Sequence, residues 1–246
     1  MTTTKKLFLT VAMVAGLALG AHSAAAGDSN GNFQVKVGLT GVWTDDETNR
    51  LDAAVPGLGT VDLLAVGAEA STDDIAIPTL TLTYYFNKNI AIELFCCFGQ
   101  TSIVAEGAIA AAGEIAEVWM FPPILTLQYH FDGMGAIRPY VGAGVEWIHY
   151  FDEKVGNNGL GASSVDLEDS FGFALQAGVD LDLGGGWSLG LDVKKVWEDT
   201  EIRWRNAAAA GGGDIIAEHD IDPLIATVNI GYRFNLFGPR ESAPLK

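Results

Sequence analysis

The sequence predicts an all-β protein, an eight-stranded antiparallel transmembrane β-barrel. Three observations predict it: segments in which apolar and polar residues alternate, connections that are short and long in turn, and an apolar composition. Of the 246 residues, 49% are hydrophobic and 18% are charged. Outside the first residues we find no uninterrupted apolar run near the roughly 18 residues that a spanning helix needs. Apolar residues spread over alternating segments are typical of a membrane barrel.

The N-terminus has the pattern of a signal peptide. Lys5 and Lys6 form a basic segment, and residues 7–19 form an apolar one. Ser23-Ala24-Ala25-Ala26 then offers a cleavage site of small residues. We therefore expect export and removal of residues 1–26.

The rest of the chain divides into a barrel, residues 27–234, and a C-terminal tail, residues 235–246. The mature chain would carry 31 acidic residues against 12 basic ones, which are the 14 of the full chain less the two lysines of the leader. Its net charge of −19 argues against nucleic acid as a partner.

A nine-residue segment occurs twice in the sequence and is central to the strand assignment. PTLTLTYYF at 78–86 returns as PILTLQYHF at 123–131, and VNIGYRF at 228–234 has the same Tyr-x-Phe ending. In each copy one parity is apolar and the other is mainly Thr, Gln or His. A period of two indicates a strand with one apolar and one polar face. The aromatic ending favours a membrane-spanning strand that ends at an interfacial girdle.

The same alternation continues along the chain and predicts eight strands in order. Their ranges are 33–43, 78–86, 90–99, 123–131, 138–151, 171–183, 187–203 and 224–234. Three short turns contain Asn, Asp and Gly, which adopt tight-turn dihedrals readily: 87–89, 132–135 and 184–186. Four long connections cover about 44–76, 100–117, 152–168 and 204–221. This order places the short turns and both chain ends in the periplasm and the long loops outside.

These residues resemble the OmpW family of outer-membrane proteins, which includes an alkane-uptake, AlkL-like branch. The resemblance rests on the two copies of the nine-residue segment and on RPYVGAGV at 138–145, SFG at 170–172, QAGVD at 176–180, LDVKKV at 191–196 and IDP at 221–223. It implies a narrow barrel with a hydrophobic channel for small hydrophobic molecules. Family members usually end at the Phe of Tyr-Arg-Phe, which the barrel-assembly machinery reads. Here Asn235-Leu236-Phe237-Gly238-Pro239 follows, so this chain departs from the family at its assembly signal.

Parity assigns each strand residue to the lipid or the lumen, and strand direction assigns its height. The lumen-facing residues of the outer half are apolar, and we predict that they form a hydrophobic lumen: Val42, Ile77, Phe95, Met120, Ile124, Ile148, Val196 and Ile225. Those of the periplasmic half are polar, and we predict that they form a polar plug: Lys36, Glu93, His130, Arg138, Asp180, Asp192, Lys194 and Arg233. An eight-stranded barrel is just wide enough for side chains to fill it, and buried charges must be paired. The apolar set is alternatively ordinary core packing.

A solute that enters from outside would meet the plug, so the remaining exit is sideways through the wall. Pro78, Pro122, Pro123 and Pro223 lie where strands begin at the outer end, and each lacks a ladder donor. We predict that the first three are gate prolines, although prolines also simply begin strands. The apolar loop residues Leu58, Val61, Leu63, Leu64 and Val66 would need a cover or a hydrophobic ligand.

Other functions have weaker support in the sequence. His149 with Asp152 and Ser163 or Ser164 is the one candidate catalytic trio, and no elbow motif frames those serines, so we expect no enzyme. We expect no cofactor and no metal site, and the adjacent Cys96 and Cys97 would point to opposite faces. The expected partners are outer-membrane lipids and lipopolysaccharide, small hydrophobic solutes and the barrel-assembly machinery. The alternative function is a structural or adhesive barrel whose long loops bind an extracellular partner.

Overall fold

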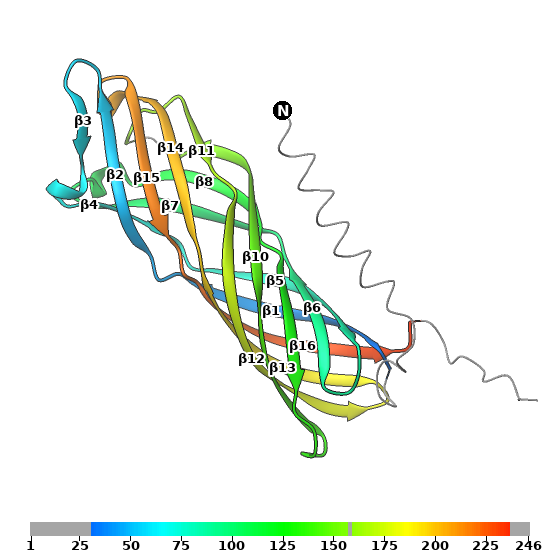
Figure 1. The fold of residues 1–246 in the computed structure, drawn as a ribbon. Helices are drawn as coiled ribbons and strands as arrows, with labels where there is room; N and C mark the ends of the chain where they lie inside the picture. The colour runs from blue at the N-terminus through cyan, green and yellow to red at the C-terminus, as the bar shows by residue number, and fades with distance from the viewer. Residues whose placement is uncertain (1–30, 157–158, 237–246) are drawn as a thin grey trace, which may run out of the picture.

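A computed structural model describes residues 31–156 and 159–236, and the predicted signal peptide and most of the tail lie outside them. Eight antiparallel strands close a barrel in the order β12-β13-β16-β1-β5-β6-β9-β10, and pairing of β10 with β12 completes the ring (Figure 1). The predicted fold is confirmed. The barrel strands are β1 (Phe33–Trp43), β5 (Ile75–Tyr85), β6 (Ile90–Cys96), β9 (Ile124–His130), β10 (Ile137–Val155), β12 (Ser170–Gly184), β13 (Trp187–Trp197) and β16 (Leu224–Phe234).

The barrel wall has its apolar face outside. In β13, Leu189 and Leu191 are half exposed, whereas the alternating Asp192 and Lys194 are buried in the lumen. An apolar outer face is the arrangement that a lipid bilayer requires. The turn between β12 and β13 consists of Gly184, Gly185 and Gly186, all with positive φ, a conformation that glycine adopts at little cost.

The four long connections are not loops, because most of their residues form strands. These strands are β2 (Glu47–Val55), β3 (Gly59–Asp62), β4 (Ala68–Thr72), β7 (Gly99–Gly107), β8 (Glu114–Phe121), β11 (Ser164–Leu167), β14 (Asp199–Ala207) and β15 (Gly213–Asp220). They pair in the orders β8-β7-β4, which continues from β10, and β11-β14-β15-β2-β3. Figure 1 shows them rising beyond one end of the barrel, and we call them the extension.

The extension has a hydrophobic core of its own. Its fully buried side chains include Trp204, Ala116 and Val118, and Leu63 and Leu64 pack against the core from the edge. Of the two alternatives for the apolar loop residues, a cover or a ligand, the structure supplies the cover for Leu63 and Leu64. Three short 3-10 helices connect the strands: η1 (Leu64–Val66), η2 (Ala110–Ala112) and η3 (Ala208–Ala210). No helix in the described residues is long and apolar enough to cross a membrane.

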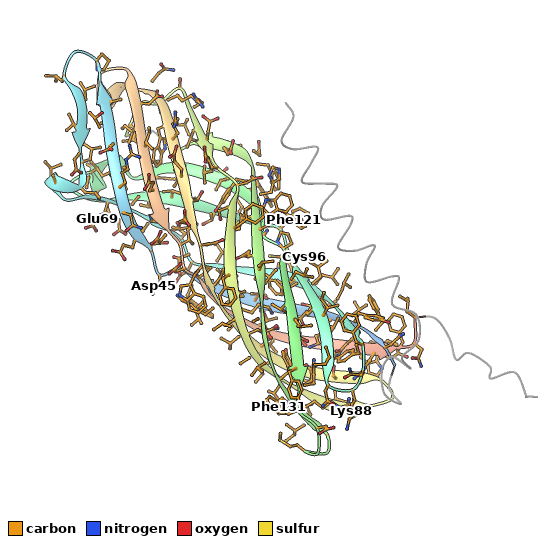
Figure 2. The ribbon with its side chains drawn as sticks, viewed as in Figure 1. Asp45, Glu69, Lys88, Cys96, Phe121 and Phe131 are labelled. Carbon is orange, nitrogen blue, oxygen red and sulfur yellow. The ribbon has the colours of Figure 1, made fainter. Side chains whose placement is uncertain are left out.

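Aromatic rings mark the two ends of the lipid-facing wall. At the short-turn end, Tyr-x-Phe pairs form ring contacts within one strand, as between Tyr129 and Phe131 at 5.1 Å. At the other end of the lipid-facing wall, where the barrel meets the extension, Phe98 stacks on Phe121 with the ring centroids 4.9 Å apart. Figure 2 shows Phe131 and Lys88 at the short-turn end, and Cys96 and Phe121 where the barrel meets the extension. Two aromatic girdles of this kind are typical of the two membrane interfaces.

Candidate functional site

A cavity lies inside the molecule where the barrel meets the extension. It encloses about 750 Å³ between its atoms, including the space open to solvent. Six of the eight predicted lumen residues line it: Val42, Ile77, Phe95, Met120, Ile148 and Ile225. The other two, Ile124 and Val196, are fully buried and pack with Phe95 and Ala174. The predicted set therefore comes together in space, and most of the cavity surface is apolar.

Below the cavity, the lumen is filled by paired charges. The Lys36 ammonium lies 2.9 Å from Asp180 Oδ2, and both side chains are almost fully buried. The Lys194 ammonium pairs with Asp192 and lies 3.3 Å from Glu93 Oε1. These five members of the predicted plug compensate one another, as buried charges must.

The remaining predicted plug residues lie nearer the short-turn end. His130 is buried and forms a hydrogen bond with Gln128, with 3.0 Å between Nε2 and Oε1. Arg233 stacks over the Tyr85 ring at 3.5 Å and donates from Nε to the Gly31 carbonyl. Arg138 is half exposed at the rim and lies 3.3 Å from Asp182. Arg138 is therefore a rim residue, while the other plug residues are buried.

Several lumen residues that the sequence reading did not single out connect these ion pairs. Gln176 donates from Nε2 to Glu93 at 2.7 Å and to Asp192 at 2.6 Å. The Tyr140 hydroxyl donates to Asp192 at 2.8 Å, and Lys36 lies over the Tyr140 ring. Their inward parity was readable, but their neutral side chains gave no reason to single them out.

Three threonines from adjacent strands form a layer inside the wall. Thr40 Oγ1 lies 2.8 Å from the hydroxyls of both Thr79 and Thr227, and all three residues are buried. The threonines satisfy one another across β5, β1 and β16, so this part of the wall adds no unpaired polar group to the lumen.

Two glutamates interrupt the apolar lining of the cavity. Glu146 of β10 and Glu198, between β13 and β14, are 2% and 5% exposed and both line the cavity. Their side chains share a hydrogen bond. Neither glutamate is among the lumen or plug residues predicted from the sequence. They meet across β12: Glu146 lies opposite Gly172, and a Cβ added at Gly172 would lie 3.0 Å from the Glu198 Cβ.

The barrel wall has an interruption beside the cavity. The β5–β6 ladder ends at Leu80 opposite Cys96, and the next backbone hydrogen bond above it runs from Asp73 N to Ser102 O. Among the described residues, positions 75–79 of β5 have no ladder partner on that side. We call this stretch the seam.

The side chains at the seam also line the cavity. Ile75 and Ile77 of β5 and Met120 of β8 surround Gly99, within 3.2–3.7 Å of where its Cβ would be. All three line the cavity, so the seam lies between the cavity and the outside of the wall. The ladder on the opposite side of β6 and β7 is also interrupted. Phe95 of β6 pairs with Ile124 of β9, Gly99 of β7 pairs with Met120 of β8, and the residues between these two pairs have no ladder partner on this side. Phe98 stacks on Phe121 at this interruption.

The predicted gate prolines differ in their surroundings. Pro78 lies within the unpaired stretch of β5 and is exposed. Pro122 is buried and lines the cavity, whereas the Pro123 carbonyl accepts a hydrogen bond from Trp147 N at 3.1 Å. The Pro223 carbonyl likewise accepts from Val196 N. Only Pro78, of these four, lies on the seam itself.

The catalytic trio considered from the sequence is not assembled. His149 Nδ1 lies 2.9 Å from Asp169, whereas Asp152 pairs with Lys154. The Ser163 hydroxyl donates to the Arg205 carbonyl. These three side chains therefore have separate partners.

Two other groups that the sequence reading considered are placed as follows. Cys97 is buried at the cavity and Cys96 is half-buried, and both are free thiols. His219 is buried and lies 3.3 Å from Asp46. Among the described residues no group of three His, Cys, Asp or Glu side chains is arranged to hold a metal ion.

Comparison with known proteins places this architecture in a family. The model of the OmpW family matches residues 29–234. The chain belongs to the OmpW family. It is 32% identical to an uncharacterized outer-membrane protein of Sinorhizobium fredii over 202 residues, 82% of this chain and 80% of that one. It is 28% identical to the outer membrane protein AlkL of Ectopseudomonas oleovorans over 232 residues, 90% of this chain and 94% of AlkL.

A solved structure gives the same result. The crystal structure of the outer membrane protein OprG from Pseudomonas aeruginosa superposes with a TM-score of 0.74 at 28% identity, over 85% of this chain and all of OprG. Family and fold together place this OmpW-family member in the outer membrane. Barrels of that membrane have short periplasmic turns, so the extension faces outward.

Proposed function

We propose that the protein is a passive outer-membrane channel for small hydrophobic molecules, which enter the cavity from outside and leave sideways into the membrane. The observation that carries the proposal is the cavity lined by Phe95, Ile148 and Ile225 above a lumen closed by paired charges. An alkane-like solute gains roughly 25 cal/mol for each Å² of apolar surface that it removes from water. The paired charges of the polar plug offer an apolar solute no comparable apolar contacts, so movement further toward the periplasm is unfavourable.

The seam supports a sideways exit. Its unpaired backbone stretch includes Pro78, which has no N–H to donate, and its filling consists of flexible apolar side chains. A solute that displaces Ile75 and Ile77 breaks no ladder hydrogen bond on that side. The outer aromatic girdle at Phe98 and Phe121 lies at the same height, which corresponds to the outer leaflet.

The cavity is tested by placing a charge in it. Ile148 is 3% exposed, so Ile148→Asp buries a carboxylate at a cost of several kcal/mol unless it is protonated or draws in water. Either response spoils the site for an alkane-like molecule. We expect uptake of a small hydrophobic probe into whole cells to fall at least tenfold, while leakage of a hydrophilic sugar stays low.

Two further variants control this experiment. Val66→Asp makes the same kind of change at an extension residue that is 64% exposed, and it should leave uptake unchanged. Ile148→Trp fills the cavity without a charge and should also slow uptake. Heat-modifiable migration on a gel verifies that each barrel is folded. Normal uptake through both folded Ile148 variants would favour the structural or adhesive alternative.

The seam is tested separately by filling it. The Cβ of an added side chain at Gly99 would meet Ile75, Met120 and Ile77 at 3.2–3.7 Å, all at flexible side-chain ends. Gly99→Ile should therefore fold, keep the cavity able to bind a hydrophobic probe, and slow transfer of that probe into the membrane. Unchanged transfer in this variant would contradict a sideways exit at the seam.

A further inference from the structure

The Glu146–Glu198 pair is unusual for its surroundings. Both carboxyl groups lie on a cavity that is otherwise lined mostly by apolar side chains, above the plug and separate from its ion pairs. The nearby Lys194 ammonium is already engaged by Glu93 and Asp192. Among the described residues, neither Glu146 nor Glu198 forms an ion pair with a cationic side chain.

The hydrogen bonds around the pair leave one position open. Ser170 Oγ donates to Glu198 Oε2 at 3.3 Å, and the two glutamates share a hydrogen bond, which needs one proton between them. Glu146 Oε2 is buried and has no hydrogen-bond partner among the described residues. A buried acceptor without a donor is unfavourable, so a donor that enters the cavity gains a hydrogen bond at this atom.

We propose that Glu146 and Glu198 bind the polar end of the transported molecule, which is an apolar chain that ends in a hydrogen-bond donor, an alcohol or an ammonium group. This inference rests on the proposed function and narrows its substrate class. The chain would lie against Phe95, Ile148 and Ile225, and the O–H or N–H would donate to Glu146 Oε2. An apolar chain that ends in a carboxylate is rejected, because it brings a third acidic group to a buried pair that already shares one proton.

The test compares four ligands of equal chain length: n-octane, 1-octanol, n-octylammonium and octanoate. Their dissociation constants are measured for the mature protein in lipid nanodiscs, with binding to empty nanodiscs subtracted so that partition into lipid does not count. One hydrogen bond to a buried, charged acceptor corresponds to roughly a tenfold change in affinity. We expect 1-octanol or octylammonium to bind about tenfold more tightly than octane, and octanoate to bind no more tightly than octane.

Two variants then locate the effect. The double variant Glu146→Leu, Glu198→Leu removes both carboxyl groups and keeps side chains of similar size, whereas Glu198→Gln leaves Glu146 Oε2 open and lets the new amide donate to the other Glu146 oxygen. We expect the preference for the donor-bearing ligands over octane to disappear in the double variant and to remain in Glu198→Gln. The ratio of octanol to octylammonium affinity in the wild type shows whether a neutral or a cationic end is preferred, and either result supports the proposal.

The outcomes are distinguishable from those of the proposed function. Equal corrected affinities for octane, octanol and octylammonium in the wild type would overturn the inference and leave the hydrophobic channel standing. Tight octanoate binding, or a preference that persists in the double leucine variant, would also overturn it. Binding of none of the four ligands would remove the proposed function and the inference together. The four wild-type dissociation constants test the proposal on their own, so it can be overturned even if a variant fails to fold.

Discussion

Strand β10 runs through both the barrel and the extension, and its inward-facing side chains change character on the way. Tyr140 belongs to the hydrogen-bond network of the plug, and Ile148 and Tyr150 belong to the apolar core above it. The outward side changes in the opposite sense, from half-exposed Val141 and Val145 to the exposed His149. One strand therefore has a polar interior in one half of the molecule and an apolar interior in the other.

The difference shows what stabilises each half. In the extension, water lies outside, so burial of apolar side chains drives folding as in a soluble protein. In the barrel, lipid lies outside and apolar side chains gain little by moving inward. The interior is instead held by ion pairs and hydrogen bonds that must all be satisfied. The two halves should consequently respond to different kinds of mutation.

The largest effect is expected from breaking the ion cluster in the barrel. Lys194→Met leaves the buried carboxylates of Glu93 and Asp192 without their cation, which should cost about 3–5 kcal/mol of unfolding free energy. Urea unfolding in lipid vesicles measures it. The control is Lys195→Met at the next residue. Its part-exposed ammonium lies 3.8 Å from Asp45 and donates to the Asp222 carbonyl, so the change should cost only about 1 kcal/mol. Equal losses in the two variants would contradict a stabilising ion cluster.

A comparable but local effect is expected in the extension. The fully buried Trp204 donates from Nε1 to the Ile115 carbonyl at 2.9 Å, so Trp204→Ala should destabilise the extension by about 3–5 kcal/mol. Protease cleavage within β14 and β15 should increase while the barrel remains heat-modifiable. Part-exposed Arg203, changed to alanine, is the neighbouring control. If Trp204→Ala also unfolds the barrel, the two halves are not held independently.

A smaller pair of effects sharpens the comparison between the two faces of the barrel wall. Leu127 is 58% exposed toward lipid, and Leu127→Arg should cost about 2–4 kcal/mol near mid-membrane. Gln128 is buried and donates to Gln176 at 3.1 Å, so Gln128→Leu should cost about 1 kcal/mol for each hydrogen bond lost. Both follow from urea unfolding in vesicles. Equal losses of unfolding free energy in the two variants would contradict the assignment of Leu127 to the lipid face and Gln128 to the lumen.

The barrel was predictable because one rule applies to all eight strands. Alternation with aromatic ends locates a strand such as β9 within one residue at each end, and parity then places Glu93 and Lys194 inside. The extension escaped prediction although its strands alternate too. Its inward residues are often alanine, as at Ala53, Ala116 and Ala217, which read as loop composition but allow close packing of sheets.

The seam and the acid pair were beyond the sequence for a different reason. The break between β6 and β7 falls at Cys97–Phe98, within an apolar run that continues the alternation of β6, and the sequence predicts one continuous strand that ends at the Gly99 that follows. Glu146 and Glu198 are 52 positions apart, and the register of β10, β12 and β13 brings them together across Gly172. Features that arise between strands are set by register, which a single sequence does not state.

The continuity of β10 also bears on how the protein is assembled. A slip of one residue in its pairing would turn the lipid-facing Val145 inward and expose the Glu146 carboxyl to the bilayer, and it would bring Ile148 out of the extension core in the same movement. A register error in either half is therefore also unfavourable in the other half. A misaligned strand would be destabilised both in the lipid-facing barrel and in the water-facing extension. The 19 residues of this strand carry one register through both halves, so an alignment error made in the barrel is also an alignment error in the extension.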